Sequence, residues 1–240
     1  MHSALLLVYR GKRLLLDVGE TWAGRFEQLR PDWIAITHAH PDHSFGLKSG
    51  TVRPVFVTRE SFELLRRYPV ADFRILRPNR VKHIGPFQVL AYPVIHSLRA
   101  PAVGFRVTAG GVTIVYNPDV ISIPSADRIL RGIDAYIGDG ATLTHPFVRR
   151  HGDLLFGHTT VRAQLGWCKR YGVPRAFIAH CGKQLVQLPH AVLQRIVSEM
   201  AGPELPVTVA FDGLRVLIRR RTATRIFGKH ALSSRLRKVQ

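Results

Sequence analysis

The sequence has few acidic residues and almost no cysteine. Its 240 residues include two cysteines, Cys168 and Cys181, which cannot form the disulfide framework of a small secreted domain. We therefore expect a reducing, cytoplasmic location. No apolar run approaches the roughly 18 residues of a membrane span, so no membrane partner is predicted. The apolar segment at residues 4–8 precedes its neighbouring basic residues, which predicts a strand rather than a signal peptide.

The shortage of acidic residues leaves a large positive charge. Lys and Arg number 35 against 16 Asp and Glu, a formal net charge of +19 at pH 7. Such an excess attracts polyanions, nucleic acid first, although an arginine-rich base composition would produce the same excess without a function. Residues 219–240 contain basic residues and no acidic one. They are interpreted as a basic C-terminal tail, either a nucleic-acid-binding extension or a solvated segment.

The most informative motif is the stretch THAHPDH at residues 37–43, which follows an apolar run at residues 33–36. Such a run predicts a buried strand, so the motif lies at a strand end. It contains four residues of metal-ligand type, His38, His40, Asp42 and His43. Strand periodicity places the first two on one side, and Pro41 turns the chain so that the other two bend back. Imidazole and carboxylate suit zinc and related metals. A polar loop with chance histidines is the alternative.

The order of these residues is the HxHxDH signature, so the chain resembles the metallo-β-lactamase superfamily. The resemblance implies an α/β (α+β) fold, the αββα sandwich of two similar halves, with two divalent metal ions at the edge between them. It says little about the substrate, because the superfamily includes lactamases, thioesterases, lactonases, phosphodiesterases and nucleases. We expect one domain at residues 1–218, followed by the basic tail at residues 219–240.

The resemblance extends to later strand ends. The passage from residue 86 to 119 is similar to the "P-V-x-HS … Y-x-x-D" block of the phosphodiesterase and nuclease branch. His96 then matches the third ligand of the first metal, beside His38 and His40, and Asp119 the bridging aspartate. His180, after the apolar residues 173–179, matches the last ligand of the second metal, beside Asp42 and His43. Asp17 matches the aspartate that supports the ligand loop from behind, with a plain turn aspartate as the alternative.

Two further segments resemble tRNase Z, the endonuclease that matures transfer-RNA 3′ ends. Asp139 begins a segment similar to the acid-plus-EATF motif, and His158 one similar to the HST motif. The resemblance implies that His158 donates a proton to the leaving oxygen and that Asp139 orients it. The match departs from the family, with Asp139 in place of glutamate and Thr159 in place of serine. A helix-capping histidine beside a loop aspartate is the alternative. No long insertion resembles the transfer-RNA-gripping arm.

These observations predict a dinuclear-metal-dependent hydrolase, most simply a phosphodiesterase or nuclease that cleaves RNA or DNA with metal-activated hydroxide. Asp42, His158 and Asp139 are its expected catalytic residues. The expected cofactors are two divalent ions, zinc first, with manganese or iron as alternatives. Other candidate functions are a phosphodiesterase for cyclic or dinucleotide substrates, a carbon-ester hydrolase such as a lactonase or thioesterase, and a nucleic-acid-binding protein with a structural metal. A nucleic acid or nucleotide phosphodiester is the expected partner, and a homo-oligomer is left open.

The remaining pattern gives a coarse secondary structure. Hairpins are expected within residues 4–19, 103–116 and 207–218, and helices within residues 21–29, 44–47, 60–68, 159–170 and 189–200. Residues 73–84 are basic and are expected to be irregular. His83 within them is expected to be structural or exposed, and Cys181 is not assigned to a metal.

Overall fold

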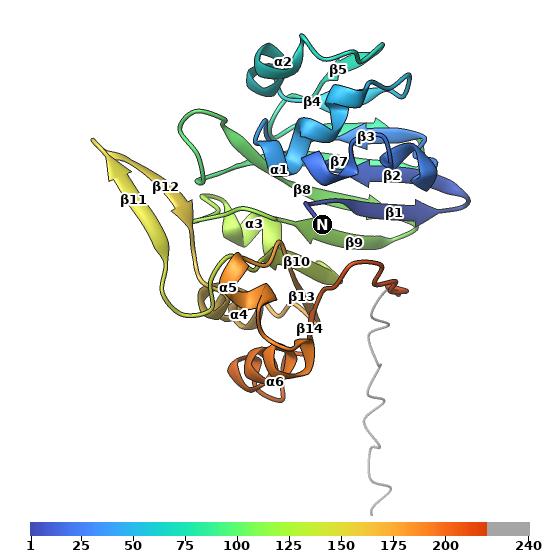
Figure 1. The fold of residues 1–240 in the computed structure, drawn as a ribbon. Helices are drawn as coiled ribbons and strands as arrows, with labels where there is room; N and C mark the ends of the chain where they lie inside the picture. Colours follow the sequence, from blue (N-terminus) through green and yellow to red (C-terminus); the bar gives the residue numbers. More distant parts are fainter. Residues whose placement is uncertain (220–240) are drawn as a thin grey trace, which may run out of the picture.

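A computed structural model describes residues 1–219 of the chain, and the predicted tail from residue 220 onward lies outside them. Two large sheets and a separate hairpin make up the β-structure (Figure 1). The first sheet has the order β1 (Leu5–Tyr9), β2 (Lys12–Leu16), β3 (Trp33–Ala35), β4 (Val55–Val57) and β5 (Phe73–Ile75). The second has the order β14 (Val207–Val209), β13 (Ala176–Ala179), β10 (Ala135–Asp139), β9 (Val112–Tyr116), β8 (Ala102–Ala109), β7 (Phe87–Val94) and β6 (Val81–Ile84). The hairpin consists of β11 (Phe147–His151) and β12 (Leu154–His158).

The helices are short. The α-helices are α1 (Pro41–Ser44), α2 (Arg59–Leu65), α3 (Ala126–Leu130), α4 (Val161–Arg170), α5 (Lys183–Val186) and α6 (His190–Ala201). The 3-10 helices are η1 (Glu20–Trp22), η2 (Phe26–Leu29) and η3 (Phe45–Ser49). Within residues 1–219, none of the helices combines the length and the apolar character that a bilayer crossing requires.

Three consecutive leucines show how the layers form. Successive side chains of a strand point to opposite faces, and all three leucines of β2 are fully buried. Leu14 and Leu16 pack into the core between the two sheets together with Phe105 of β8. Leu15 packs on the opposite face with Phe26, under the short helices of the N-terminal half. An apolar environment on both faces requires a covering layer outside the sheet as well as a second sheet inside.

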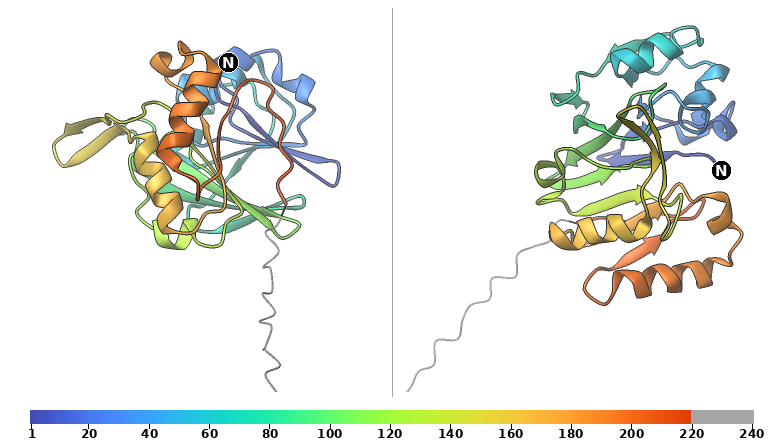
Figure 2. Two further views of the ribbon diagram at one scale, coloured as in Figure 1. Left: turned by 90° about the horizontal axis from the view of Figure 1, so that it is seen from below. Right: turned by 90° about the vertical axis from the view of Figure 1, so that its left-hand side faces the viewer.

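The outer face of the second sheet is covered in the same way. Tyr136 of β10 and Ile178 of β13 are buried against Leu165 of α4 and Val197 of α6. The order of layers is therefore helix, sheet, sheet, helix, as the views in Figure 2 show. The predicted αββα sandwich is confirmed.

Several strands end at one edge of this sandwich. In the second sheet β9, β10 and β13 are parallel neighbours. Strand β7 is antiparallel to β8, which is antiparallel to β9, so β7 runs in the same direction as β9. The segments that follow β7, β9, β10 and β13 consequently leave the sheet at the same edge. This edge is where the polar residues of the sequence motifs gather.

Some expected elements differ from those observed. Residues 73–84 include strands β5 and β6 rather than being irregular throughout, although His83 is exposed as expected. The helix expected at residues 21–29 is replaced by η1 and η2. The hairpin expected at residues 207–218 is wrong, because β14 pairs in parallel with β13 and no strand follows it in the described residues. Leu214 and Ile218 instead pack their side chains against the core between the sheets.

Candidate metal centre and acid–base pair

The histidine motif lies between β3 and the first turn of α1. His38 and His40 are in the extended segment after the strand, and α1 begins at Pro41. Proline suits the first turn of a helix because the N–H that it lacks has no partner there. The next two residues, Asp42 and His43, are therefore carried back towards the preceding histidines.

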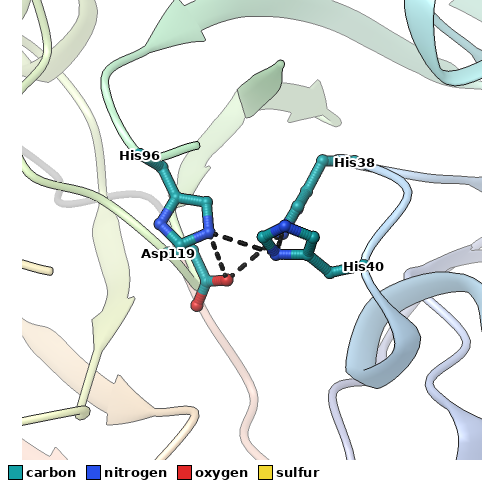
Figure 3. Close-up of side chains that lie close together, drawn as sticks. All are labelled: His38, His40, His96 and Asp119. Carbon is teal, nitrogen blue, oxygen red and sulfur yellow. Dashed lines mark hydrogen bonds and ion pairs between the residues drawn. The ribbon is translucent and has the colours of Figure 1, made fainter. Parts of the chain in front are cut away.

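The first group of candidate ligands is His38, His40, His96 and Asp119 (Figure 3). His40 Nδ1 lies 2.9 Å from His38 Nε2 and 3.4 Å from His96 Nε2. Asp119 Oδ2 lies 3.3 Å from His38 Nε2 and 3.1 Å from His96 Nε2. Nitrogen ligands about 2.0–2.1 Å from a tetrahedral zinc ion are themselves about 3.3–3.4 Å apart. The four side chains therefore converge at a spacing that suits one ion.

The second group is Asp42, His43, His180 and again Asp119. His180 Nε2 lies 2.9 Å from Asp42 Oδ2 and 3.3 Å from His43 Nε2. Asp119 Oδ2 lies 3.2 Å from His43 Nε2, and Asp119 Oδ1 lies 2.9 Å from His180 Nδ1. Because Asp119 belongs to both groups, its carboxylate is placed to bridge two ions. The structure thus brings together all seven residues that the sequence motifs single out as metal ligands.

The outer nitrogen of several imidazoles is held by a hydrogen bond. His43 Nδ1 lies 2.9 Å from Asp17 Oδ2. The Thr37 hydroxyl donates to Asp17, so it accepts the hydrogen bond from His38 Nδ1 at 3.0 Å. His96 Nδ1 donates to the Gly157 carbonyl at 2.9 Å. Such contacts fix the ring orientation and leave the other nitrogen free to bind a metal.

Asp17 lies behind the candidate ligands, where the resemblance implies that it should. The roles of Thr37 and Gly157 were not predicted from the sequence. The sequence does indicate a role for Thr37, because it immediately precedes His38. Gly157 is distant from His96 in sequence, and only the tertiary structure brings the two into contact. Asp17 and His180 are both non-glycine residues in the left-handed backbone region, with φ of 61° and 49°. Such conformations are uncommon and concentrate at functional sites.

The electrostatics of the cluster favour bound cations. Burial lowers the pKa of His38 to about 3, and the charge of His43 acts in the same direction, so the His38 ring is neutral. Burial alone would raise the pKa of Asp119, but the charges of His43 and His180 hold it well below its usual value. Burial would also raise the pKa of Asp42, and its hydrogen bonds with His180 and His43 lower it instead. Neutral imidazole and ionised carboxylate are the forms that bind metals. Burial would lower the pKa of His43 and His180, but the charge of Asp119 raises both, so a metal bound at the second group would displace their protons.

Two buried atoms of the cluster remain without a hydrogen bond. Asp119 Oδ1 and His180 Nδ1 have no hydrogen-bond partner among residues 1–219. They lie 2.9 Å apart, but their relative orientation does not meet the angles of a hydrogen bond. Buried polar atoms are nearly always satisfied, and an ion is one way to satisfy them. The donor set and its spacing fit divalent metal ions.

The second sequence-predicted feature is the pair formed by His158 and Asp139. His158 ends β12 and Asp139 ends β10, and His158 Nδ1 lies 2.8 Å from Asp139 Oδ2. The Asp139 carboxylate also accepts hydrogen bonds from the backbone N–H groups of Val120 and Ala141, at 3.1 and 2.8 Å. Burial would lower the pKa of His158, but the hydrogen bond and the charge of Asp139 raise it. The imidazole is therefore stabilised in its protonated form.

The pair lies against the metal candidates. His158 Nδ1 is 3.8 Å from Asp119 Oδ1, and the His158 side chain is 22% exposed. Its Nε2 makes no hydrogen bond to the part of the chain that the structure describes. Asp119, Asp139, His158 and His180 also lie close enough together to hold an ion, so a role for His158 as a ligand competes with a role as an acid. Cys181, which the sequence did not assign to a metal, belongs to none of the groups found within residues 1–219.

Gln164 of α4 positions Asp139 and has no sequence signal. It is fully buried, and its side-chain amide bonds both backbone groups of Asp139. The Asp139 N–H donates to Gln164 Oε1 at 2.8 Å, and Gln164 Nε2 donates to the Asp139 carbonyl at 2.7 Å. The Tyr136 hydroxyl donates to the same Oε1 at 2.9 Å. The end of β10 is thus held by a helix that follows it in sequence by more than twenty residues.

Comparison with known proteins gives the following relationships. Residues 12–181 match the family described as the beta-lactamase superfamily domain. No curated protein matches the sequence. Among solved structures the chain is similar to a diphosphatase from the PhnP family, with a TM-score of 0.68 and 22% identity, over 89% of this chain and 82% of the other.

Two further structures have similar folds. An isothiocyanate hydrolase from Delia radicum gut bacteria has a TM-score of 0.68 and 14% identity, over 90% of this chain and 96% of the other. The short form of human tRNase Z has a TM-score of 0.58 and 18% identity, over 91% and 93%. At these identities the likeness shows a shared fold and leaves the substrate open.

Proposed function

The chain belongs to the metallo-β-lactamase superfamily, and on that basis we propose that it is a hydrolase that uses two divalent metal ions to cleave phosphodiester bonds of RNA or DNA. His38, His40 and His96 would hold one ion, Asp42, His43 and His180 the other, and Asp119 would bridge them. Two ions bound there would make hydroxide available at neutral pH and stabilise negative charge on the substrate.

The observation that carries the choice of substrate is the pairing of His158 with Asp139. Asp139 accepts the hydrogen bond from His158 Nδ1 at 2.8 Å, which leaves Nε2 as the proton donor. The raised pKa of His158 keeps that proton available near neutral pH. A departing ribose or alcohol oxygen requires a proton, whereas a thiolate leaves without one, so the pair favours a phosphodiester over a thioester. The leaving oxygen of a lactone also needs a proton, and it is the net charge of +19 that favours a phosphodiester over a lactone. A positioned acid of this kind contributes about 10²–10⁴-fold to the rate.

Charge and fold relationships support the same substrate class. The formal net charge of +19 attracts a polyanionic substrate. A diphosphatase and a tRNase Z are among the structures of similar fold. An isothiocyanate hydrolase has the same fold, so the fold is also compatible with substrates that contain no phosphate.

The test is a substrate panel on protein whose metal content has been measured after loading with zinc or manganese. The panel contains bis-p-nitrophenyl phosphate, a single-stranded RNA, a cyclic dinucleotide, a lactone and a thioester. We expect turnover of the phosphodiesters and little turnover of the two carbon esters. Turnover confined to the carbon esters would contradict the phosphodiester assignment. A His38→Ala/His40→Ala variant tests the remaining alternative. If the wild type turns over no substrate, and the variant loses its metal but still binds RNA, the protein is a nucleic-acid-binding protein.

A further inference from the structure

The hairpin formed by β11 and β12 projects away from both sheets, as Figures 1 and 2 show. Phe147, Val148 and Leu154 are exposed by 49%, 38% and 59%. A two-stranded hairpin on its own is only marginally stable in water. Apolar side chains gathered on such a projecting element are typical of an interaction surface.

The register of the two strands determines which side chains share a face. Phe147 is opposite His158, Arg149 is opposite Phe156, and His151 is opposite Leu154. Directly opposed residues lie on the same face, and alternate residues of a strand do so too. We call these six residues the His158 face. Arg150 and Val148 lie on the other face.

The His158 face leads outward from the candidate active site. Strands rise about 3.4 Å per residue, so Arg149 and Phe156 lie about 7 Å beyond the row that contains His158. Arg149 is exposed and makes no ion pair with any of residues 1–219. An unpaired guanidinium beside an exposed ring, Phe147, and a half-buried one, Phe156, is therefore presented next to the site rather than on a remote surface.

The base of the hairpin is fixed to the same site. The Gly157 N–H donates to the His96 carbonyl at 2.7 Å, and the Gly157 carbonyl accepts from His96 Nδ1 at 2.9 Å. Gly157 has a φ of +121°, and a Cβ there would lie 1.7 Å from the Phe147 carbonyl oxygen, so the strands can approach only at a glycine. Together with the bond from His158 to Asp139, these contacts set the direction of the hairpin relative to the reacting atoms.

From this arrangement we propose that the His158 face binds the nucleotides of a single-stranded nucleic acid beyond the bond that is cleaved. Arg149 contacts a phosphate that is not the scissile one, and Phe156 stacks on a base. Cationic grooves with aromatic platforms are the usual means of binding single strands. The assignment rests on the proposed phosphodiesterase function and adds to it a binding site for an extended substrate.

A second copy of this chain fits the hairpin less well. The free edge of β11 could pair with β11 of another copy, as exposed strand edges often do. The strand is centred on Arg149, so an antiparallel pairing about that centre would bring arginines of the two copies together. Like charges directly opposite each other are destabilising, whereas a polyanion is attracted to the same residues.

Arg149 and Arg150 provide a matched pair for the experiment, because the same side chain occurs at adjacent positions on opposite faces. Metal-loaded Arg149→Ala and Arg150→Ala proteins would be assayed with a fluorescein-labelled 12-nucleotide single-stranded RNA and with bis-p-nitrophenyl phosphate, which has only its scissile phosphate. Affinity for the RNA would be measured by fluorescence anisotropy over a range of salt concentrations.

We expect Arg149→Ala to lower kcat/KM for the RNA, relative to that for bis-p-nitrophenyl phosphate, by about fivefold, and to reduce the salt slope of RNA affinity by about 0.7. Phe156→Ala should weaken RNA binding by about tenfold through lost stacking. Arg150→Ala should change kcat/KM and affinity for the RNA by less than about twofold and leave the salt slope unchanged, because its side chain faces away.

Equal effects of the two arginine substitutions, or none from either, would overturn the proposal. The wild type could also cleave bis-p-nitrophenyl phosphate and fail to bind the RNA. That result would overturn the binding face and leave the proposed hydrolase intact. Conversely, specific loss of RNA affinity in Arg149→Ala, without turnover of any phosphodiester by the wild type, would support the binding face and refute the phosphodiesterase. A dimer in light scattering that dissociates in Leu154→Asp would assign the hairpin to a second copy instead.

Discussion

Replacement of His158 by alanine separates the two roles that this residue could have. If His158 is the acid, His158→Ala removes the proton donor and leaves the seven metal-ligand candidates unchanged. If it is a ligand, the substitution removes one member of the group formed with Asp119, Asp139 and His180. If His158 is the acid, kcat falls while the metal content stays the same. If it is a ligand, kcat and the metal content fall together.

The expected size of the effect depends on the leaving group. A positioned general acid contributes about 10²–10⁴-fold, so cleavage of an RNA dinucleotide, which releases a ribose oxygen, should slow by that factor. The same range is about 2.7–5.5 kcal/mol of transition-state stabilisation. Bis-p-nitrophenyl phosphate releases a stable phenolate, which needs little protonation, and its cleavage should slow by less than about tenfold.

The assay measures kcat for both substrates and metal per chain by plasma mass spectrometry. His83→Ala is the matched control, because His83 is an exposed histidine on β6 and belongs to none of the candidate ligand groups in the described residues. The reasoning is refuted if both substrates slow equally in His158→Ala, or if the variant loses metal while the control retains it.

Three further predictions concern the bridging carboxylate, the residue that holds Asp139, and a buried thiol. Asp119→Ala should lower the metal content from about two ions per chain to fewer than one, because both groups share this carboxylate; retention of two ions would show that it does not bridge. Gln164→Leu should lower the free energy of unfolding by about 2–4 kcal/mol, because the buried backbone groups of Asp139 lose their partners; denaturant titration with an unchanged midpoint would contradict this. Ellman's reagent should not react with Cys168 in the native protein, since burial raises the pKa of its thiol to about 12. Cys181 is partly exposed and serves as the internal comparison, and both thiols should react after unfolding.

Much of the candidate site could be predicted because its parts are local in sequence. His38, His40, Asp42 and His43 lie within six residues, and the strand period and Pro41 constrain their directions without help from the rest of the chain. The other candidates follow apolar strands, and parallel strands that end at one edge bring their following residues together. The order of the strand-end residues along the chain therefore indicated which side chains should lie together in the metal site.

Two turn sequences show where the sequence pattern and the observed strands differ. The β11–β12 hairpin contains a Gly152-Asp153 turn between residues that can form strands, which is a recognisable hairpin pattern. The Asp212-Gly213 turn gives a similar signal, yet no strand follows it in residues 214–219. There, packing of apolar side chains onto the core between the sheets replaced backbone pairing. Whether a turn sequence leads into a second strand therefore depends on the surroundings of the residues that follow it, which can pack on the core instead of pairing.

The sequence by itself determined the chemical types of the ligands and their order, because alternation and spacing act within a few residues, and the layered fold followed from the resemblance that the HxHxDH signature carries. The resemblance predicted a bridging position for Asp119, and the structure places its carboxylate beside both ligand groups. Only the tertiary structure decided that Gln164 holds Asp139 and that the hairpin carrying His158 is fixed to His96. These relations join segments far apart in the chain, and their geometry depends on how the two sheets and their helices pack, which no local pattern encodes.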